Sequence, residues 1–288
     1  MNPVIVCVAK KEHDYIEEFV RYHLALGFKY IYIYDNEDVP TYGKMLEKYN
    51  NNIKVIHAPI KPVQYESLRD FVQNYLFKTN ITHAAHIDVD EFIVLKKHNN
   101  ICDFINEYIV GDCQGIGMNW RFFGSSGNQE KTDEPNTIRF KMCEDKGNIH
   151  IKTLFKTTYF MSYNTCHDVK LSRGYIKSTN GTIINGPFNH NIDFSAIQLN
   201  HYKCKTLPEF RHIRTRGRAD FKEYDENVDE QFTIYDKNEV QELTAYHFYK
   251  NIVLNMDTTS KKMLNHRPLI QIPTAKTAIK KIFKNVSC

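Results

Sequence analysis

Three acidic residues inside an otherwise apolar stretch restrict the fold and chemistry of this sequence more than any other feature. Asp88, Asp90 and Glu91 interrupt the run 84–94, which has the length and composition of a buried strand. In an extended chain side chains alternate, so Asp88 and Asp90 would point to one side while Val89 and Glu91 point to the other. Burying such carboxylates without partners is costly, so the sequence predicts that a cation or strong donors meet them.

Two carboxylates at a strand end form a hard oxygen site that suits Mg²⁺ or Mn²⁺. Such ions are usually held by few protein oxygens, and phosphate oxygens and water complete the coordination shell. The alternative is a solvated turn between a strand and a helix, where Asp and Glu are common. The apolar neighbours favour the metal–diphosphate interpretation, because they indicate a largely buried segment.

Length, charge and cysteine usage exclude several classes of protein. The chain has 288 residues, which suits one large domain or two small ones, and its net charge of +4 gives no reason to expect a nucleic-acid partner. Its seven cysteines are scattered without a C-x-x-C pair. This pattern favours reduced thiols in the cytoplasm, which would be the host cytoplasm for a viral protein, and gives no zinc-ligand spacing. No window reaches the apolar length of a membrane span.

Strand and helix patterns alternate through the first third of the chain. The sequence predicts strands at 3–8, 30–34, 53–58 and 84–87, and helices from about residue 14, at 42–49 and at 68–77. This alternation is typical of βαβ units around a parallel sheet. Ligands of such sheets bind at the carboxyl ends of the strands. The polar clusters 9–12, 35–38 and 88–91 should therefore converge at one edge.

The rest of the chain reads as further strands followed by a polar helical region. We predict a helix at 103–108, strands at 115–123, 138–143, 149–160 and ending at 202, and a basic helix at 208–219. Residues 276–284 form a basic amphipathic tail. For this tail a solvated final helix is favoured over contact with an anionic membrane surface.

Four segments together carry a family signature. They are His86–Phe92 (HIDVDEF), Glu17–Asn36, Asn119–Gly127 with its W-x-x-F-G-S-S-G stretch, and Asn200–Ala219 with its H-Y, K-T and R-G-R-A groups. They resemble the D-V-D-E-F motif and flanking regions of glycosyltransferases with the GT-A fold, closest to the family-2-like group and family 92. The similarity runs from about residue 3 to 220, with Thr206 in place of the family's Ser.

This resemblance implies an α/β fold of the GT-A (Rossmann-like) type, a mixed and mainly parallel sheet flanked by helices. The glycosyltransferase domain would cover 1–220, with the nucleotide-sugar half at about 1–95 and the acceptor half at about 96–220. Residues 221–288 would form a helical C-terminal extension.

The implied activity moves a sugar from a nucleotide-sugar, UDP-linked by resemblance, to a hydroxyl of a glycan, protein or lipid-linked acceptor with inversion. Mn²⁺ or Mg²⁺ would be the cofactor. In this family the second Asp of the motif bridges the metal to the diphosphate, so Asp90 would ligate the ion and His201 would be a further ligand. Asp88 would lie by the ribose or reach the metal through water. A nucleotidyltransferase and a non-catalytic nucleotide-sugar-binding module stay open as alternatives.

The remaining site residues also follow from the resemblance and from their place in the chain. The nucleoside pocket would include Ala9, Glu12 and Asp35, with Asp35 accepting from the base or ribose. Arg69 would contact the diphosphate, unless it is merely solvated on a helix face. Trp120 and Phe123 would stack on the acceptor sugar, although a lone Trp is more often a core residue.

Inverting transfer also needs a base that removes the acceptor's proton. Asp168 is the first candidate, because it follows a strand-rich segment in a loop that would face the acceptor. His167 is its neighbour, and Glu91 and Asp145 are alternatives. An exposed loop Asp without a catalytic part is the competing interpretation.

Overall fold

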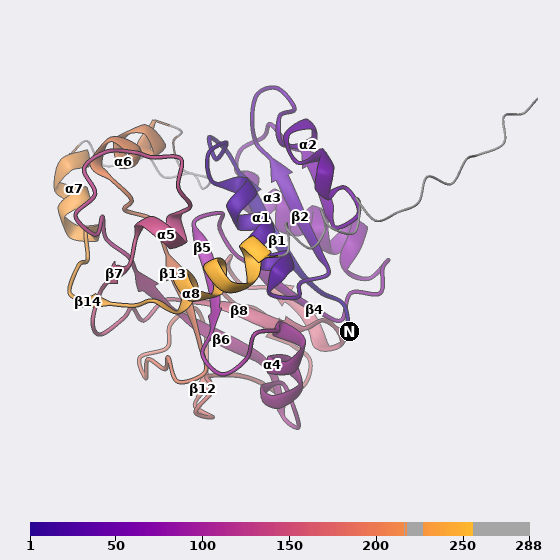
Figure 1. Cartoon of the computed structure of the whole chain (residues 1–288). Helices are drawn as coiled ribbons and strands as arrows, with labels where there is room; N and C mark the ends of the chain where they lie inside the picture. Colours follow the sequence, from indigo (N-terminus) through magenta and orange to yellow (C-terminus); the bar gives the residue numbers. More distant parts are fainter. Residues whose placement is uncertain (216, 218–226, 256–288) are drawn as a thin grey trace, which may run out of the picture. The chain divides into compact units, whose positions relative to one another are not determined.

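Four parallel strands form the first half of the central sheet, as the sequence predicts. They are β1 (Pro3–Ala9), β2 (Tyr30–Asp35), β3 (Ile53–His57) and β4 (His83–His86). Their order in the sheet is β3-β2-β1-β4, and each neighbouring pair is parallel (Figure 1). This computed structural model describes residues 1–215, 217 and 227–255, and contacts group Met1–Val253 into one unit.

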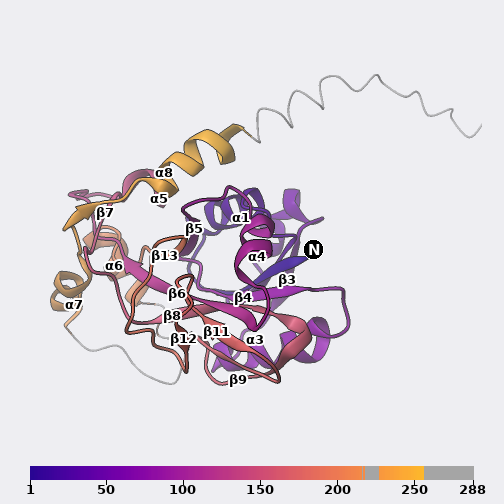
Figure 2. The same ribbon diagram turned by 90° about the horizontal axis from the view of Figure 1, so that it is seen from below.

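Helices cover both faces of these strands. Along the chain, the strands are connected by α1 (Ile16–Ala25), α2 (Tyr42–Met45) and α3 (Val63–Phe71). Figure 2 shows α1 and α3 on opposite sides of the sheet. The alternation along β1 follows from this arrangement: Ile5 packs with the α1 cluster, whereas Val6 packs with Phe71 of α3. Both faces of β1 are therefore buried, which explains its continuous apolar sequence.

The second half of the sheet is mixed. Strand β8 (Ile151–Lys156) runs antiparallel between β4 and β6 (Cys113–Phe122). Beyond β6 lie β11 (Tyr175–Lys177) and β12 (Ile183–Ile184), which complete the path β12-β11-β6-β8-β4-β1-β2-β3. With β5 and β13 the sheet has ten strands in the described residues, and the predicted α/β class with a mainly parallel, helix-flanked sheet is confirmed.

The acidic motif lies where the chain leaves this sheet. Strand β5 (Glu91–Leu95) starts at the last residue of the motif and pairs antiparallel with β13 (Ile197–His201). Strand β13 also pairs parallel with the end of β6, where His201 is opposite Phe122. These pairings bring His201 close to the motif, although more than a hundred residues separate them in sequence.

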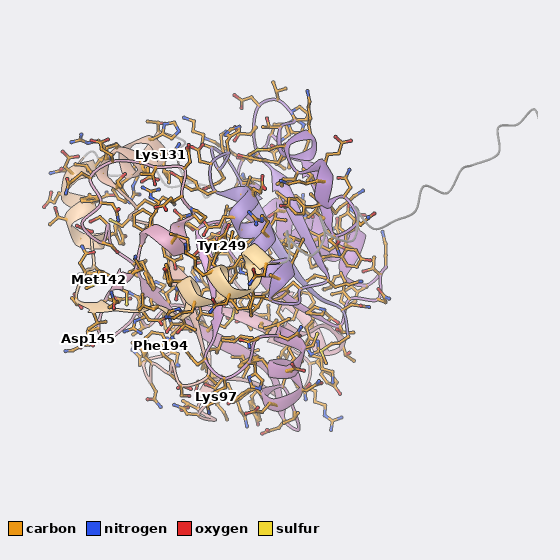
Figure 3. The ribbon with its side chains drawn as sticks, in the orientation of Figure 1. Lys97, Lys131, Met142, Asp145, Phe194 and Tyr249 are labelled. Atoms are coloured by element: carbon orange, nitrogen blue, oxygen red, sulfur yellow. The ribbon has the colours of Figure 1, made fainter. Side chains whose placement is uncertain are left out.

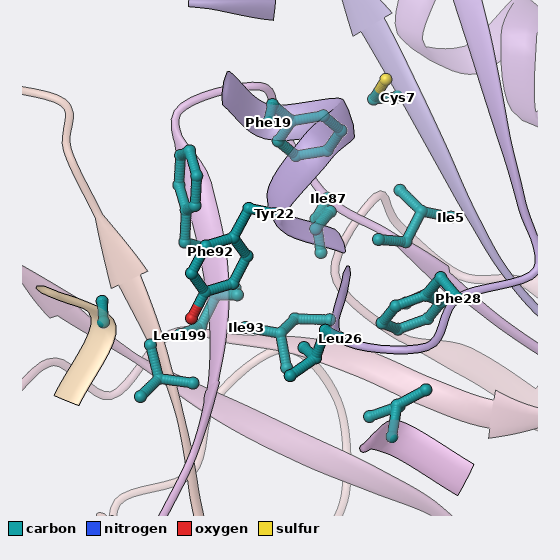
Figure 4. Packing of buried hydrophobic residues seen from close by; sticks show 14 of the residues in the cluster. Ile5, Cys7, Phe19, Tyr22, Leu26, Phe28, Ile87, Phe92, Ile93 and Leu199 are labelled. Carbon is teal, nitrogen blue, oxygen red and sulfur yellow. The ribbon is translucent and has the colours of Figure 1, made fainter. Parts of the chain in front are cut away.

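An aromatic cluster fixes β5 against α1 (Figure 4). The ring centroid of Phe92 lies 5.1 Å from that of Tyr22 and 6.0 Å from that of Phe19. Between them His23 donates from Nδ1 to the Phe19 carbonyl at 2.9 Å and accepts the Ile93 N–H on Nε2 at 3.3 Å. Burial lowers the pKa of His23 to about 3, so this imidazole is neutral and joins the helix to the strand.

Helices and short strands after β6 pack on the same unit. They are α5 (Asn136–Arg139), β7 (Met142–Cys143), α6 (Leu207–Arg214), α7 (Val228–Tyr235), β14 (Val240–Gln241) and α8 (Thr244–Phe248). Strand β14 pairs with β7, and Tyr249 (labelled in Figure 3) accepts a hydrogen bond from Arg21 at 3.4 Å. Residues 227–253, for which the sequence predicts part of a C-terminal extension, therefore belong to the unit that holds the sheet.

The other described elements are short. They are η1 (Glu47–Tyr49), η2 (Val72–Leu76), α4 (Ile101–Tyr108), η3 (Thr157–Tyr159), β9 (Phe160–Tyr163), β10 (Val169–Leu171) and η4 (Tyr249–Val253). The predicted strand 149–160 is thus interrupted by the 3₁₀ turn η3. The tail 276–284 and most of the predicted 221–288 extension lie outside the described residues.

The predicted strand at 138–143 is confirmed only at its end, as β7, and is wrong in its first part, which α5 occupies. The cause is a distant carboxylate: Glu18 of α1 accepts the backbone N–H groups of Asn136 and Thr137 at 2.7 and 2.9 Å. Satisfying these N–H groups at the start of the helix stabilises a turn that the local sequence does not encode.

A buried ion pair joins α5 to α6. Arg139 contacts Glu209 through two hydrogen bonds of 2.8 and 2.7 Å, and both side chains are 2% exposed. Glu209 also accepts from Tyr15 Oη at 2.8 Å and closes a capping box with Thr206 at the start of α6. Burial favours the neutral form of Glu209, but these donors outweigh it and lower its pKa to about 2.

Gly124 allows a close backbone contact at the end of β6. Its N–H donates to the Lys237 carbonyl at 2.8 Å, and an added Cβ would lie 2.4 Å from that same oxygen. We expect Gly124→Ala to lower the free energy of unfolding by about 1–3 kcal/mol, as overpacking usually does. Urea denaturation measures this. Gly43→Ala in α2 is the control, because nothing lies within 4 Å of its added Cβ, and equal destabilisation of both variants would contradict the explanation.

Candidate active site

The acidic motif forms a turn between β4 and β5. The Ile87 N–H donates to the Val6 carbonyl at 3.1 Å, and the Glu91 N–H donates to the Asp88 carbonyl at 2.9 Å. Val89 is buried and Asp88 is half-buried, but Asp90 is also buried. The predicted alternation of faces needs an extended chain and is wrong in this turn, because Asp88 and Glu91, predicted on opposite faces, both contact Lys152. The turn therefore stands at the carboxyl end of β4 beside the end of β1, the edge at which ligands of such sheets bind.

Lys152 of β8 meets two of the three carboxylates. Its Nζ lies 3.2 Å from Asp88 Oδ2 and 3.8 Å from Glu91 Oε2, and its side chain is 0% exposed. Glu91 Oε2 also accepts the Asp88 N–H at 2.8 Å. The predicted cation is thus a residue of the chain itself.

Electrostatics in this group favour a charged lysine and a charged aspartate. Burial alone would lower the pKa of Lys152, but the carboxylates of Asp88 and Glu91 outweigh it and raise the pKa. Burial alone would raise the pKa of Asp88, but Lys152 together with the other nearby basic groups outweighs it and lowers the pKa. Burial raises the pKa of Glu91 well above its usual value, so Glu91 is the member that tends to be neutral.

Asp90 has a different neighbour. His201 Nε2 at the end of β13 lies 3.5 Å from Asp90 Oδ1, and the two side chains are 7% and 9% exposed respectively. The Tyr202 N–H donates to the Asp90 carbonyl at 2.8 Å, which fixes the two segments against each other. Burial lowers the pKa of His201, and the charge of Asp90 partly opposes this. His201 Nδ1 is buried and has no hydrogen-bond partner among the described residues.

Aromatic and histidine rings surround Trp120 of β6, and we call this group the Trp120 cluster. Its members are Trp120, Phe122, His150, His167 and His201. The Trp120 ring stacks on His150 with centroids 4.9 Å apart, and the His167 and His201 rings lie at 5.2 and 4.6 Å. Trp120 is half-buried, and its Nε1 has no hydrogen-bond partner among the described residues.

The hydrogen bond of His167 fixes its tautomer. Its Nδ1 lies 2.9 Å from the Ile151 carbonyl, which only accepts, so Nδ1 carries the proton. The lone pair is then on Nε2. Burial, followed by the nearby charge of Lys152, lowers the pKa of His167 to about 4. At neutral pH His167 is therefore an uncharged imidazole with a basic nitrogen.

We tested these residues against the divalent ion that the resemblance implies. Within the described part of the chain, no three His, Cys, Asp or Glu side chains are grouped so as to hold an ion by themselves. Asp90 and His201 do form a carboxylate–imidazole pair whose 3.5 Å separation exceeds a typical N–H···O hydrogen bond. Such a pair fits an ion that takes its other ligands from phosphate and water.

The match to a protein family decides the identity. The model of glycosyltransferase family 92 matches residues 2–242. The chain belongs to glycosyltransferase family 92. Comparison of the sequence with curated proteins gives no significant match.

Three residues of this family 92 chain that we predicted to contact the acceptor are buried in the structure. Asp168 is 4% exposed, and its carboxylate accepts from Asn164 Nδ2 at 2.8 Å and Thr165 Oγ1 at 2.6 Å within its own turn. Phe123 is 1% exposed and packs on Tyr202 in the core, so it does not face a sugar. Glu91 is 0% exposed beneath the motif, where it cannot reach an acceptor.

The predicted nucleoside pocket is also revised in part. Asp35 is 1% exposed, and its carboxylate accepts the N–H groups of Glu37, Thr41 and Tyr42. The Asp35 carboxylate therefore stabilises the loop that follows it, and the predicted hydrogen bond to the base or ribose is withdrawn. Ala9 and Glu12 are buried near this loop: the Ala9 carbonyl accepts the Asn36 N–H, and Tyr42 Oη accepts the Glu12 N–H.

Two predicted polar residues are on the surface of the glycosyltransferase. Arg69 is exposed on α3, where it pairs with Glu66. Asp145, labelled in Figure 3, is exposed. Its N–H donates to Glu239 at 2.8 Å, and this arrangement does not place it in the Trp120 cluster.

Sequence reasoning missed Lys152, His150 and Phe122. Lys152 lies between Ile151 and Thr153 in its strand, a position that fits a solvent-facing lysine equally well. Phe122 had a usable signal, because residues two apart on a strand share a face and Trp120 was already assigned to the site. No signal in the sequence identifies His150. In the described residues no helix of this family 92 chain is long and apolar enough to cross a membrane.

Proposed function

We propose that this chain is a metal-dependent inverting glycosyltransferase with a GT-A-type fold. The donor would be a UDP-sugar, and the acceptor a hydroxyl of a glycan, protein or lipid-linked sugar. The observation that carries the proposal is the Asp90–His201 pair, which two distant elements bring together at 3.5 Å beside the strand ends. Few structural roles require a carboxylate and an imidazole to be nearly buried together at a ligand-binding edge.

Asp90 and His201 are the residues that would hold Mn²⁺ or Mg²⁺. Such an ion supplies Lewis-acid stabilisation of the negative charge on the departing diphosphate. The protein's own contribution is to fix the two ligands, through the backbone hydrogen bond between Asp90 and Tyr202 and through the pairing of β13 with β5.

His167 is the base that we propose in place of Asp168. Its Nε2 carries a lone pair, and its ring contacts Trp120, which in turn contacts His201. This arrangement supports proton removal from a hydroxyl held beside Trp120. Trp120 would provide the aromatic face for a sugar, and its unpaired Nε1 a hydrogen-bond donor for a hydroxyl.

We also propose that the enzyme works in the cytoplasm. Six cysteines in the described residues are free, and four of them, Cys7, Cys113, Cys143 and Cys204, lie buried in the structure. Free thiols throughout a fold of this size support a reducing compartment.

A donor screen tests the proposed function. Purified protein is incubated with UDP-, GDP- and CMP-sugars in Mn²⁺ or EDTA, and release of the free nucleotide is followed by chromatography. We expect release from one UDP-sugar that stops in EDTA and falls at least about 100-fold in Asp90→Asn, the scale of losing a key transition-state interaction. Asp112→Asn is the control, because Asp112 is exposed and forms its ion pair with Lys177, away from the acidic motif.

Three outcomes would contradict the proposal. Equal release of the nucleotide in Mn²⁺ and in EDTA would show that the reaction does not depend on a divalent ion. Tight binding of a nucleotide-sugar without any turnover would favour a non-catalytic binding module. Release of pyrophosphate from a nucleoside triphosphate would instead indicate a nucleotidyltransferase.

A further inference from the structure

Phe188 is an exposed aromatic residue on a fixed backbone. The residue is 42% exposed. Hydrogen bonds on both sides of it hold the chain against the segment that enters β8. The Ile151 N–H donates to the Pro187 carbonyl at 3.1 Å, and the Asn189 N–H donates to the Ile149 carbonyl at 2.7 Å. A ligand that binds to an aromatic ring on such a fixed backbone pays little for ordering the protein.

Ring contacts connect Phe188 to the Trp120 cluster. The centroids of the Phe188 and His150 rings lie 4.8 Å apart. The His150 ring in turn lies 4.9 Å from that of Trp120 and 5.8 Å from that of His167. His150 Nδ1 donates to Asn148 Oδ1 at 2.7 Å, which fixes the orientation of this linking ring. Single apolar side chains on a surface are common, but Phe188 is the outer end of a run of rings that begins at the candidate site.

The exposed ring of Phe188 has the chemistry of a sugar-binding surface. The face of an aromatic ring is negative, so it attracts the slightly positive C–H groups that cover one face of a pyranose. A sugar on Phe188 is not the one that reacts, because the reacting hydroxyl must lie within hydrogen-bond distance of the base. In the described part of the chain no ring contact joins Phe188 to His167, and His150 is the ring that contacts both.

We propose that Phe188 binds a second sugar of the acceptor, the one attached to the sugar that is modified. The acceptor is then a chain of at least two sugars, and not a single sugar or a protein side chain. This inference rests on the proposed function, because it takes His167 as the base. It deepens that function by narrowing the acceptor to a hydroxyl on a chain of sugars.

Binding to an array of immobilised glycans, from single sugars to longer chains, tests the inference in the presence of Mn²⁺ and UDP. We expect wild type to bind only glycans of two or more sugars. Phe188→Ala should bind them at least about fivefold more weakly, the scale of removing an aromatic anchor. Phe188→Tyr should bind as wild type does, because it keeps the ring. Phe77→Ala is the matched control, because Phe77 is 63% exposed and its ring packs against Phe160 of β9.

Fluorescence of Trp120, the only tryptophan of the chain, gives a second measurement in solution. A glycan retained on the array should change the emission of wild type and Phe188→Tyr, and the same change should need at least about fivefold more glycan in Phe188→Ala. Equal binding of single sugars, unchanged binding by folded Phe188→Ala, or no glycan bound by wild type would overturn the inference. Wild type that binds glycans through Phe188 but releases no nucleotide from any donor would support the subsite and contradict the proposed function alone.

Discussion

Replacing His167 with alanine should reduce kcat for sugar transfer by about 10²–10⁴-fold, the usual contribution of a positioned general base. The reason is the hydrogen bond from Nδ1 to the Ile151 carbonyl, which leaves Nε2 as the basic nitrogen beside Trp120. Donor affinity should change little, because the role belongs to the acceptor's proton. Single-turnover transfer assays and nucleotide titrations measure the two quantities separately.

Two controls accompany this variant. His190→Ala removes an exposed histidine and should leave transfer unchanged. Added imidazole should restore part of the activity of His167→Ala, because it replaces the lost base. Transfer by His167→Ala within a few fold of wild type would exclude His167 as the base.

The pH dependence of transfer follows from the same residue. The pKa of His167 is lowered to about 4, so the base is uncharged above that pH and is lost only as the pH falls through about 4. An ordinary histidine would already be protonated below about 6.5. We therefore expect kcat to be maintained between pH 7 and 5.5 in wild type, and an acid limb near pH 6.5 would contradict the lowered pKa.

Replacing Arg139 with methionine should lower the free energy of unfolding by about 3–5 kcal/mol, the cost of breaking a buried ion pair from one side. The substitution leaves Glu209 buried with its charge uncompensated, since both side chains are 2% exposed. Urea denaturation at pH 7 measures the loss. Arg211→Met is the control, because Arg211 forms a similar pair with Asp229 in solvent and should change stability little.

A double variant and the pH dependence sharpen this prediction. Arg139→Met/Glu209→Gln should be more stable than Arg139→Met alone, because no buried charge is left unpaired. In wild type the folded pKa of Glu209 is about 2, below its unfolded value near 4.3. The contribution of Glu209 to the free energy of unfolding is therefore complete above about pH 5 and is lost as the pH falls toward 2. Arg139→Met should lose less free energy of unfolding than wild type over that range.

The first half of the fold was predictable because its signals are local. The strands β1 to β3 are runs rich in β-branched and aromatic residues, and the helices that follow them have regular apolar spacing. The predictions failed where a distant residue decides the structure. Glu18 stabilises α5 from more than a hundred residues away, and no window around 138–143 contains that information.

The candidate site shows the same division. The buried carboxylates predicted a cation, and the structure supplies Lys152, but the sequence does not say which of 38 lysines and arginines it is. The place of Asp168 in a loop predicts it as the base. In the structure its carboxylate instead accepts hydrogen bonds from Asn164 and Thr165 of the same loop. Its neighbour His167 points its Nδ1 to Ile151 and joins the Trp120 cluster, which only pairing between strands reveals.

The central claim is that Asp90 and His201 act together on a metal-bound nucleoside diphosphate, and calorimetric titration of Mn²⁺ with UDP tests it most directly. Wild type, Asp90→Asn, His201→Ala and the double variant are compared, with Asp112→Asn as control. We predict that each single substitution weakens binding by about 10–100-fold and that the double variant is weaker by less than the sum of the two losses in binding free energy. Wild-type affinity in Asp90→Asn would contradict the account.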